Sequence, residues 1–170
     1  MRQGSELSQT FLRKQTYLLK GLLKDKGGDG VANCKAAVIR RWLAEQTDAE
    51  SWVESQFKAL MQTYECLLSD PRPANLKRVK VKGKAPQLVW RVPNENGNHV
   101  VLPLFDPARQ ECREILIRLP KPVLLALAQI ESWRVTLNYL STLHVWTTES
   151  ASALLIELET LRNVRQSYAD

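Results

Sequence analysis

One stretch decides the fold: Lys77-Arg78-Val79-Lys80-Val81-Lys82, in which valines and basic residues alternate. A period of two places alternate side chains on opposite faces of a strand. Gly83 to Pro86 then predict a turn, and two β-rich runs follow at 87–92 and 99–105, joined by a loop that contains Asn96-Gly97, a hairpin signal. The stretch therefore predicts a three-stranded antiparallel meander. Pro103 gives its last strand an edge position or a bulge.

On both sides of this meander, apolar residues recur at steps of three and four, which is typical of helices. Before the meander, the pattern predicts a helix over 6–25, a second over about 31–46, and a third that begins at Thr47. Thr47 with Glu50 forms a capping box, and prolines after residue 70 end the third helix.

After the meander, the same pattern predicts a short helix over about 107–118 and a long one over about 122–146. A last helix restarts at Thr148 or Ser150 and runs to about residue 165. The predicted fold class is α+β and mainly helical, with a small antiparallel three-stranded sheet. We expect one domain over 1–170, with helical segments at 6–69 and 107–166 and a basic β-meander at 76–105.

Length and composition agree with a single folded domain. The chain has 170 residues, 44% of them hydrophobic, and chains of this size bury enough surface for a proper core. No run approaches the ~18 apolar residues of a membrane-spanning helix, and the N-terminus lacks the apolar core of a signal peptide. Three widely spaced cysteines form no disulfide framework. These features predict a cytoplasmic protein that does not contact a membrane.

The positive charge is concentrated in one segment. The formal net charge is +6, yet the segment from Arg72 to Arg91 alone carries seven basic residues and no acidic one, which leaves −1 for the other 150 residues. The seven are Arg72, Lys77, Arg78, Lys80, Lys82, Lys84 and Arg91. One basic hairpin, rather than the whole surface, therefore makes the protein basic.

This basic hairpin predicts a nucleic-acid interface that resembles a wing. Strand alternation would place Arg78, Lys80 and Lys82 side by side about 7 Å apart, where they would neutralise phosphates and release counterions. We expect nucleic acid as the partner, with DNA favoured over RNA. The predicted site is completed by flanking cations and by a tryptophan as a stacking surface: Lys77, Lys84, Trp90 and Arg91. Two alternatives stay open, namely an edge strand that lysines protect from aggregation and a surface for an acidic protein.

A second group of polar residues follows helical spacing on the predicted long helix. It consists of Glu131, Arg134, Asn138, Ser141 and His144, here called the polar helix ridge. We interpret the ridge as a network that fixes how this helix docks, with a binding site on the helix face as the alternative. No orienting acid accompanies Ser141 and His144, and no metal-ligand spacing is present. We therefore expect no enzyme activity, no metal and no cofactor.

Three stretches of the sequence together carry a resemblance: residues 130–138 followed by Ser141, Leu143 and His144; Tyr17-Leu18-Leu19-Lys20-Gly21-Leu22-Leu23-Lys24; and Leu88-Val89-Trp90-Arg91. They resemble a family of proteins encoded on integrating conjugative elements. The family is described mostly as a domain of unknown function, and some members are called integrase regulator R. The resemblance frames roughly residues 11–165. It implies a small cytoplasmic accessory or regulatory protein of a mobile genetic element, and it supplies no active site.

A different class of function stays open beside nucleic-acid binding. The helices would then form an interaction module, either an adaptor or regulator that binds another protein without contacting nucleic acid, or a homodimer. Exposed apolar residues near Trp52, Tyr139 or Trp146 would favour this hypothesis.

Overall fold

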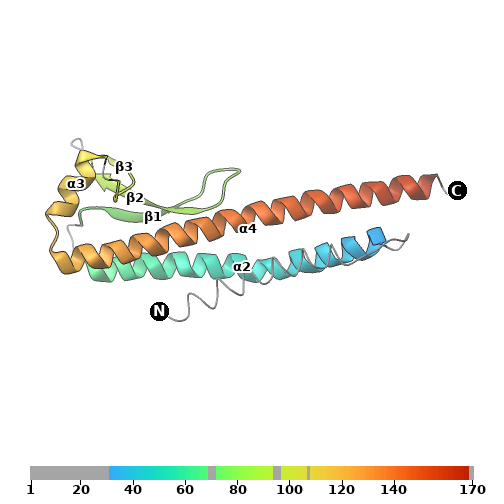
Figure 1. Ribbon diagram of the computed structural model, residues 1–170, viewed down its shortest axis with the longest axis horizontal. Helices are drawn as coiled ribbons and strands as arrows, with labels where there is room; N and C mark the ends of the chain where they lie inside the picture. Colours follow the sequence, from blue (N-terminus) through green and yellow to red (C-terminus); the bar gives the residue numbers. More distant parts are fainter. Residues whose placement is uncertain (1–30, 69–71, 94–96, 107, 169–170) are drawn as a thin grey trace. The chain divides into compact units, whose positions relative to one another are not determined.

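The computed structural model describes residues 31–68, 72–93, 97–106 and 108–168 (Figure 1). In chain order its elements are α2 (Val31–Leu67), β1 (Asn75–Val79), β2 (Gln87–Pro93), β3 (His99–Val101), α3 (Gln110–Ile117) and α4 (Lys121–Ser167). The predicted fold class, α+β and mainly helical with a small antiparallel sheet, is confirmed. The helix predicted over 6–25 lies outside the described residues.

The chain divides into two compact units. Unit 1 takes residues 1–50 and 146–170, and unit 2 takes Ser51–Val145. The described part of unit 1 has a small core of Ile39, Trp42 and Ala151. The expectation that 1–170 is one domain stays a prediction.

The two long helices are continuous where the sequence predicted breaks. α2 runs through Thr47, so no new helix begins there, and α4 runs through Thr148 and Ser150. A capping box starts a helix only if the chain before it leaves helical backbone angles, and no glycine or proline near these sites forces that change. Inside a helix, Thr and Ser cost at most ~0.7 kcal/mol each. Ser152 also donates its hydroxyl to the Thr148 carbonyl at 2.8 Å, within the helix.

The sheet has the predicted antiparallel order β1-β2-β3, but two strands are shorter than expected. β1 ends at Val79 rather than at residue 82, because Val79 pairs with Gln87, the first residue of β2. The residues between them form a loop, in which the Lys84 N–H donates to the Val81 carbonyl at 3.0 Å and Gly83 has φ +73°. β3 ends at Val101, before Pro103, and lies at the sheet edge as that proline requires.

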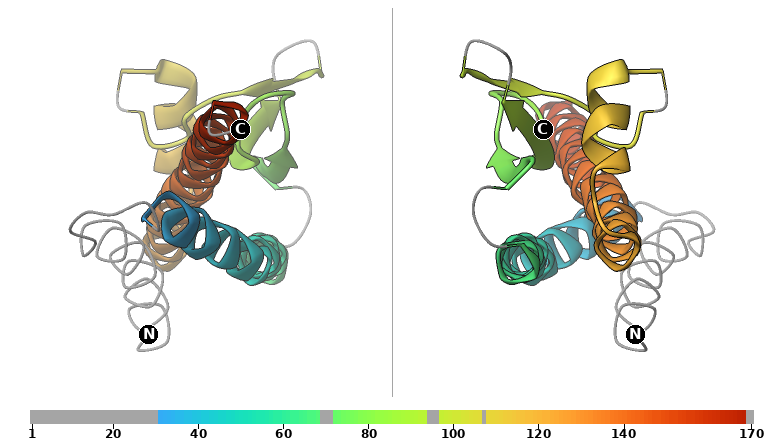
Figure 2. Two further views of the ribbon diagram at one scale, coloured as in Figure 1. Left: turned by 90° about the vertical axis from the view of Figure 1, so that its right-hand side faces the viewer. Right: turned by 90° about the vertical axis from the view of Figure 1, so that its left-hand side faces the viewer.

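One face of the sheet forms the core of unit 2. Leu76 and three alternate residues of β2, namely Leu88, Trp90 and Val92, are buried against side chains of α2 and α4. α3 and the sheet flank the first part of α4 (Figure 2). The opposite face of the sheet, here called the outer face, is left to solvent.

Among the described residues, no helix is long and apolar enough to span a membrane: neither α2 nor α4, nor the short α3, contains such a segment.

Candidate nucleic-acid interface

Two cations of the hairpin lie on the outer face of the sheet. The inner-facing residues are Leu76, Leu88 and Trp90, so alternation sends Lys77 and Arg91 to the outer face, where both are exposed. Lys77 pairs directly with Val89, two residues before Arg91. Diagonal neighbours of this kind lie about 7–8 Å apart. The two positive charges therefore form a pair on the outer face.

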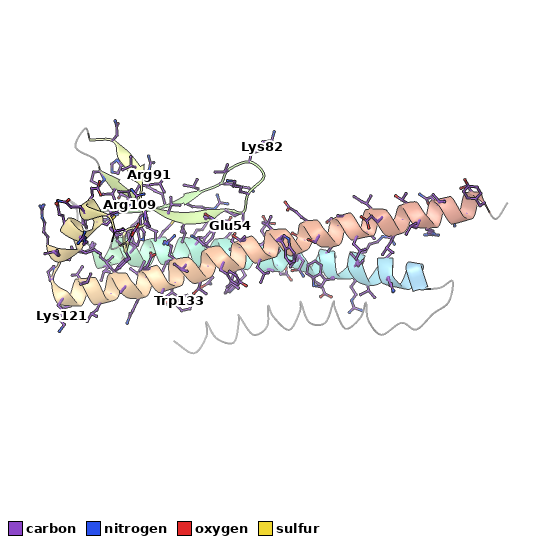
Figure 3. All side chains as sticks on the ribbon, turned by 45° about the horizontal axis from the view of Figure 1, so that its top comes forward. Glu54, Lys82, Arg91, Arg109, Lys121 and Trp133 are labelled. Atoms are coloured by element: carbon purple, nitrogen blue, oxygen red, sulfur yellow. The ribbon has the colours of Figure 1, made fainter. Side chains whose placement is uncertain are left out.

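Three further lysines lie in the loop beyond the ladder. Lys80, Lys82 and Lys84 are exposed, and Figure 3 shows Lys82 projecting from the loop, away from the helices. The predicted row of Arg78, Lys80 and Lys82 at strand spacing is therefore wrong. Pairing ends at Val79, and only Arg78 of the three stands in the strand.

Arg78 differs from the other cations because it is already neutralised. It lies on the inward side of β1, next to α2. Its Nε donates to Glu54 Oε1 at 3.0 Å, and its Nη2 makes a second contact with the same oxygen. Both side chains are about one-third exposed or less. Arg78, which the sequence predicted as a phosphate contact, is therefore held in an ion pair with Glu54.

Trp90 is a core residue and offers no stacking surface. Its side chain is 1% exposed, its ring meets Tyr64 edge-on with centroids 5.1 Å apart, and its Nε1 donates to Glu131 Oε2 at 2.7 Å. The alternation of Leu88, Trp90 and Val92 already carried this signal, because a strand with Leu and Val facing the core turns the tryptophan the same way.

Five cations of the candidate interface remain: Lys77, Lys80, Lys82, Lys84 and Arg91, here called the hairpin cations. None of the five makes an ion pair with another described residue. Arg91 Nη2 donates to the His99 carbonyl at 3.2 Å, which leaves its charge uncompensated. Unit 2 has 13 basic and 8 acidic residues in its sequence. Five of its positive charges thus gather on one hairpin without an acid.

The polar helix ridge docks α4 onto an open edge of β2. β3 pairs only with the last residues of β2, from Arg91 to Pro93, so the preceding backbone groups on that side lack a strand. The Asn138 side chain takes the place of the missing strand. Its Oδ1 accepts from the Leu88 N–H at 2.7 Å, and its Nδ2 donates to the Leu88 carbonyl at 2.9 Å. Ser141 donates to the Pro86 carbonyl at 2.8 Å. The interpretation of these residues as a docking network agrees with this geometry.

Two charged members of the ridge complete the network. Arg134 Nη1 donates to the Leu88 carbonyl at 2.9 Å, and the same side chain makes two contacts of 2.7 Å with Glu131. Burial on its own would raise the pKa of Glu131. Hydrogen bonds from Arg134 and Trp90, together with the charge of Arg134, outweigh burial and hold the pKa below its usual value. Glu131 is therefore an ionised structural group.

His144, the last ridge residue, is buried and belongs to the helix face that packs inward. Within the described ranges, no three His, Cys, Asp or Glu side chains gather in a way that could hold a metal ion. A shallow groove of about 270 Å³ lies between α2 and α4 of unit 2, lined by Leu60, Ile130, Trp133 and Leu137 among others. None of the hairpin cations lines this groove.

Sequence reasoning missed two residues that shape the interface. Glu54 neutralises Arg78 in the candidate interface, but it lies 24 positions away on α2, and no local pattern links the two. His99 lies on the outer face, where its Nε2 is 3.1 Å from Asn75 Nδ2 and its carbonyl fixes Arg91. No family model, curated protein or solved structure matches the chain.

Proposed function

We propose that this protein binds nucleic acid, with DNA favoured over RNA, through the five hairpin cations. The observation that carries the proposal is their arrangement. Three lysines on a projecting loop and two cations on the adjoining outer face have no acid among them and no ion-pair partner in the described residues. Each phosphate that such a cation neutralises releases a counterion, which favours binding at low salt.

The arrangement also bears on the alternative that the lysines protect an edge strand. Lysine protects an edge by interrupting a row of unpaired backbone groups. β1 is an edge strand, but Lys80, Lys82 and Lys84 lie past its last paired residue, Val79. Edge protection therefore accounts for Lys77 but not for the three loop lysines. Their clustering is better explained by a polyanionic ligand.

The resemblance to proteins of integrating conjugative elements extends this proposal. We propose an accessory or regulatory role beside the DNA of a mobile genetic element, with no catalytic step assigned to the chain. The polar helix ridge then serves to hold β2, and with it the hairpin, in place on α4.

Fluorescence anisotropy with labelled DNA at several salt concentrations tests the proposal. Wild type is expected to bind in the nanomolar to micromolar range near 50 mM salt, and binding should weaken steeply as salt rises. The double variant Lys80→Glu/Lys82→Glu is expected to lose most of the affinity. Lys58→Glu/Lys121→Glu is the matched control, since it reverses two exposed lysines of unit 2 outside the hairpin. Equal losses in both variants, or no binding by wild type, would contradict the proposal.

A second candidate function rests on the exposed side of α4. Leu125, Val135 and Tyr139 are each more than half exposed, and no exposed position from 122 to 145 carries a charge. Thr136 and Thr142 donate their hydroxyls to carbonyls of their own helix at 2.9 Å, which leaves methyl groups toward solvent. An uncharged apolar face of this kind is typical of a protein contact.

We propose a second copy of the chain as the occupant of this face. An uncharged surface lets two copies with the same positive net charge meet without placing like charges opposite each other. An antiparallel pair with its two-fold axis between Val135 and Thr136 would set Ser132 opposite Tyr139 of the other copy, a small residue against a large one. Sedimentation velocity at tens of micromolar tests the idea. The wild type is expected as a dimer and Tyr139→Glu as a monomer, whereas a monomeric wild type would contradict it.

A further inference from the structure

We infer that the ligand of the hairpin cations is a double-stranded nucleic acid, held by its backbone phosphates without readout of bases. The inference rests on the proposed function and narrows it to one class of ligand. It follows from three features of unit 2: the burial of the hairpin tryptophan, the pairing of one arginine, and the spread of the cations along the hairpin.

Single-strand binding depends on aromatic side chains on which unpaired bases stack, each worth about 1–3 kcal/mol. From residue 72 to 93, the hairpin segment contains one aromatic residue, Trp90. Its indole is buried, packs against Tyr64 and is hydrogen-bonded to Glu131. Exposing that ring would open the core of unit 2. The hairpin therefore offers unpaired bases no platform.

The hairpin is equally poor at reading base edges. The commonest specific contact in the major groove is an arginine or a lysine on the two acceptors of guanine, and the planar guanidinium has the fixed geometry that such a contact favours. Arg78 contacts Glu54 with its Nε and Nη2, and Arg91 donates from its Nη2 to the His99 carbonyl. The remaining hairpin cations are lysines, whose ammonium groups are point charges on flexible stems without a fixed geometry against a base edge. Their contacts with phosphates would carry no sequence information.

The spread of charge suits two strands better than one. From Gln87, where the loop joins β2, to Arg91 the strand advances four residues, about 13 Å at strand rise. This length is at least the width of either duplex groove, about 6 and 12 Å. The loop lysines and the outer-face pair therefore can contact phosphates on both sides of a groove. A duplex also presents one charge per about 1.7 Å of axis, a denser target than one strand.

A comparison of matched DNA ligands by fluorescence anisotropy tests the inference. One labelled 16-mer is measured alone, annealed to its complement, and as a second duplex of scrambled sequence, all at the same salt. We expect the duplex to bind at least tenfold more tightly than the single strand, and the two duplexes to agree within twofold. Trp90→Phe is expected to leave this ratio unchanged.

Two outcomes separate this inference from the proposed function. If the single strand binds as tightly as the duplex or more tightly, and Lys80→Glu/Lys82→Glu still abolishes binding, the duplex inference is wrong and the proposed function stands. A strong preference between the two duplexes would also overturn it. If neither ligand binds near 50 mM salt, the proposed function fails, and the inference fails with it.

Discussion

Asn138 substitutes for a missing strand beside β2, and its removal tests how the hairpin is held. In Asn138→Ala the Leu88 carbonyl keeps Arg134 as a donor at 2.9 Å. The Leu88 N–H, whose partner is Asn138 Oδ1 at 2.7 Å, loses its acceptor in a residue that is fully buried. The substitution therefore leaves the Leu88 N–H without a hydrogen-bond partner, while the Leu88 carbonyl keeps one.

The magnitude follows from these contacts. A lost hydrogen bond costs about 0.5–1.5 kcal/mol, and a buried donor without a partner about 1–3 kcal/mol. We expect a contribution of about 2–3 kcal/mol from the Leu88 contact. Alanine is the better helix former by up to about 0.7 kcal/mol, which offsets part of the loss. Thr142→Ala carries a similar propensity gain at an exposed position of the same helix, so the difference between the two variants isolates the contact.

Urea unfolding followed by circular dichroism and tryptophan fluorescence measures this difference. With a urea dependence of about 1–3 kcal/mol per molar, the midpoint of Asn138→Ala should lie about 1 M below that of Thr142→Ala. Asn138→Asp should also be destabilised, because its second carboxylate oxygen would face the Leu88 carbonyl. A midpoint for Asn138→Ala equal to that of Thr142→Ala would refute the docking role of the ridge.

Three further variants probe side chains that contact or belong to β1 and β2, namely Glu131, Glu54 and Trp90. The pKa of Glu131 in the folded protein lies below its unfolded value of about 4.3. Its ionised form therefore stabilises the fold above that pH, and this stabilisation is lost as the pH falls through the folded pKa. Glu131→Gln should be less stable than wild type at pH 7, and its stability should fall less steeply in acid-unfolding curves. Glu54→Gln frees Arg78 and should steepen the slope of log K against log salt by about 0.9 for duplex DNA, while an unchanged slope would show that Arg78 does not reach a phosphate. Trp90→Phe loses the bond to Glu131 and should lower the free energy of unfolding by about 1–3 kcal/mol without changing DNA affinity; a parallel loss of affinity would mean that the tryptophan contacts the ligand.

The sequence predicted the kinds of elements and the order of the sheet, but not where pairing stops. Alternation and the Asn96-Gly97 turn were sufficient for a meander of three antiparallel strands. The end of β1 depends on the partner of Val79, which is Gln87, and alternation continues past that point whether or not a partner exists. Residues 80–82 therefore lie in a loop, although their sequence alternates as in a strand.

The same limit applies to the candidate site. Helical spacing grouped Glu131, Arg134, Asn138 and Ser141, which the structure brings together at β2, since spacing along one helix is a local property. That the ridge would complete the edge of β2 depends on β3 being only three residues long, which no local pattern states. Arg78 counted as a free cation in the sequence because its partner, Glu54, comes from a different element. Ion pairs between distant elements decide which cations are available to a ligand, so a count of cations from the composition alone is too high.

The salt dependence of duplex binding tests the central claim most directly. If all five hairpin cations contact phosphates, the slope of log K against log salt for wild type should reach about −4.5, at about −0.9 for each phosphate. Lys80→Gln/Lys82→Gln should reduce the slope by about 1.8, while Lys58→Gln/Lys121→Gln should leave it unchanged. A wild-type slope near zero, or a slope that the hairpin variant does not alter, would contradict the claim that this hairpin binds nucleic acid.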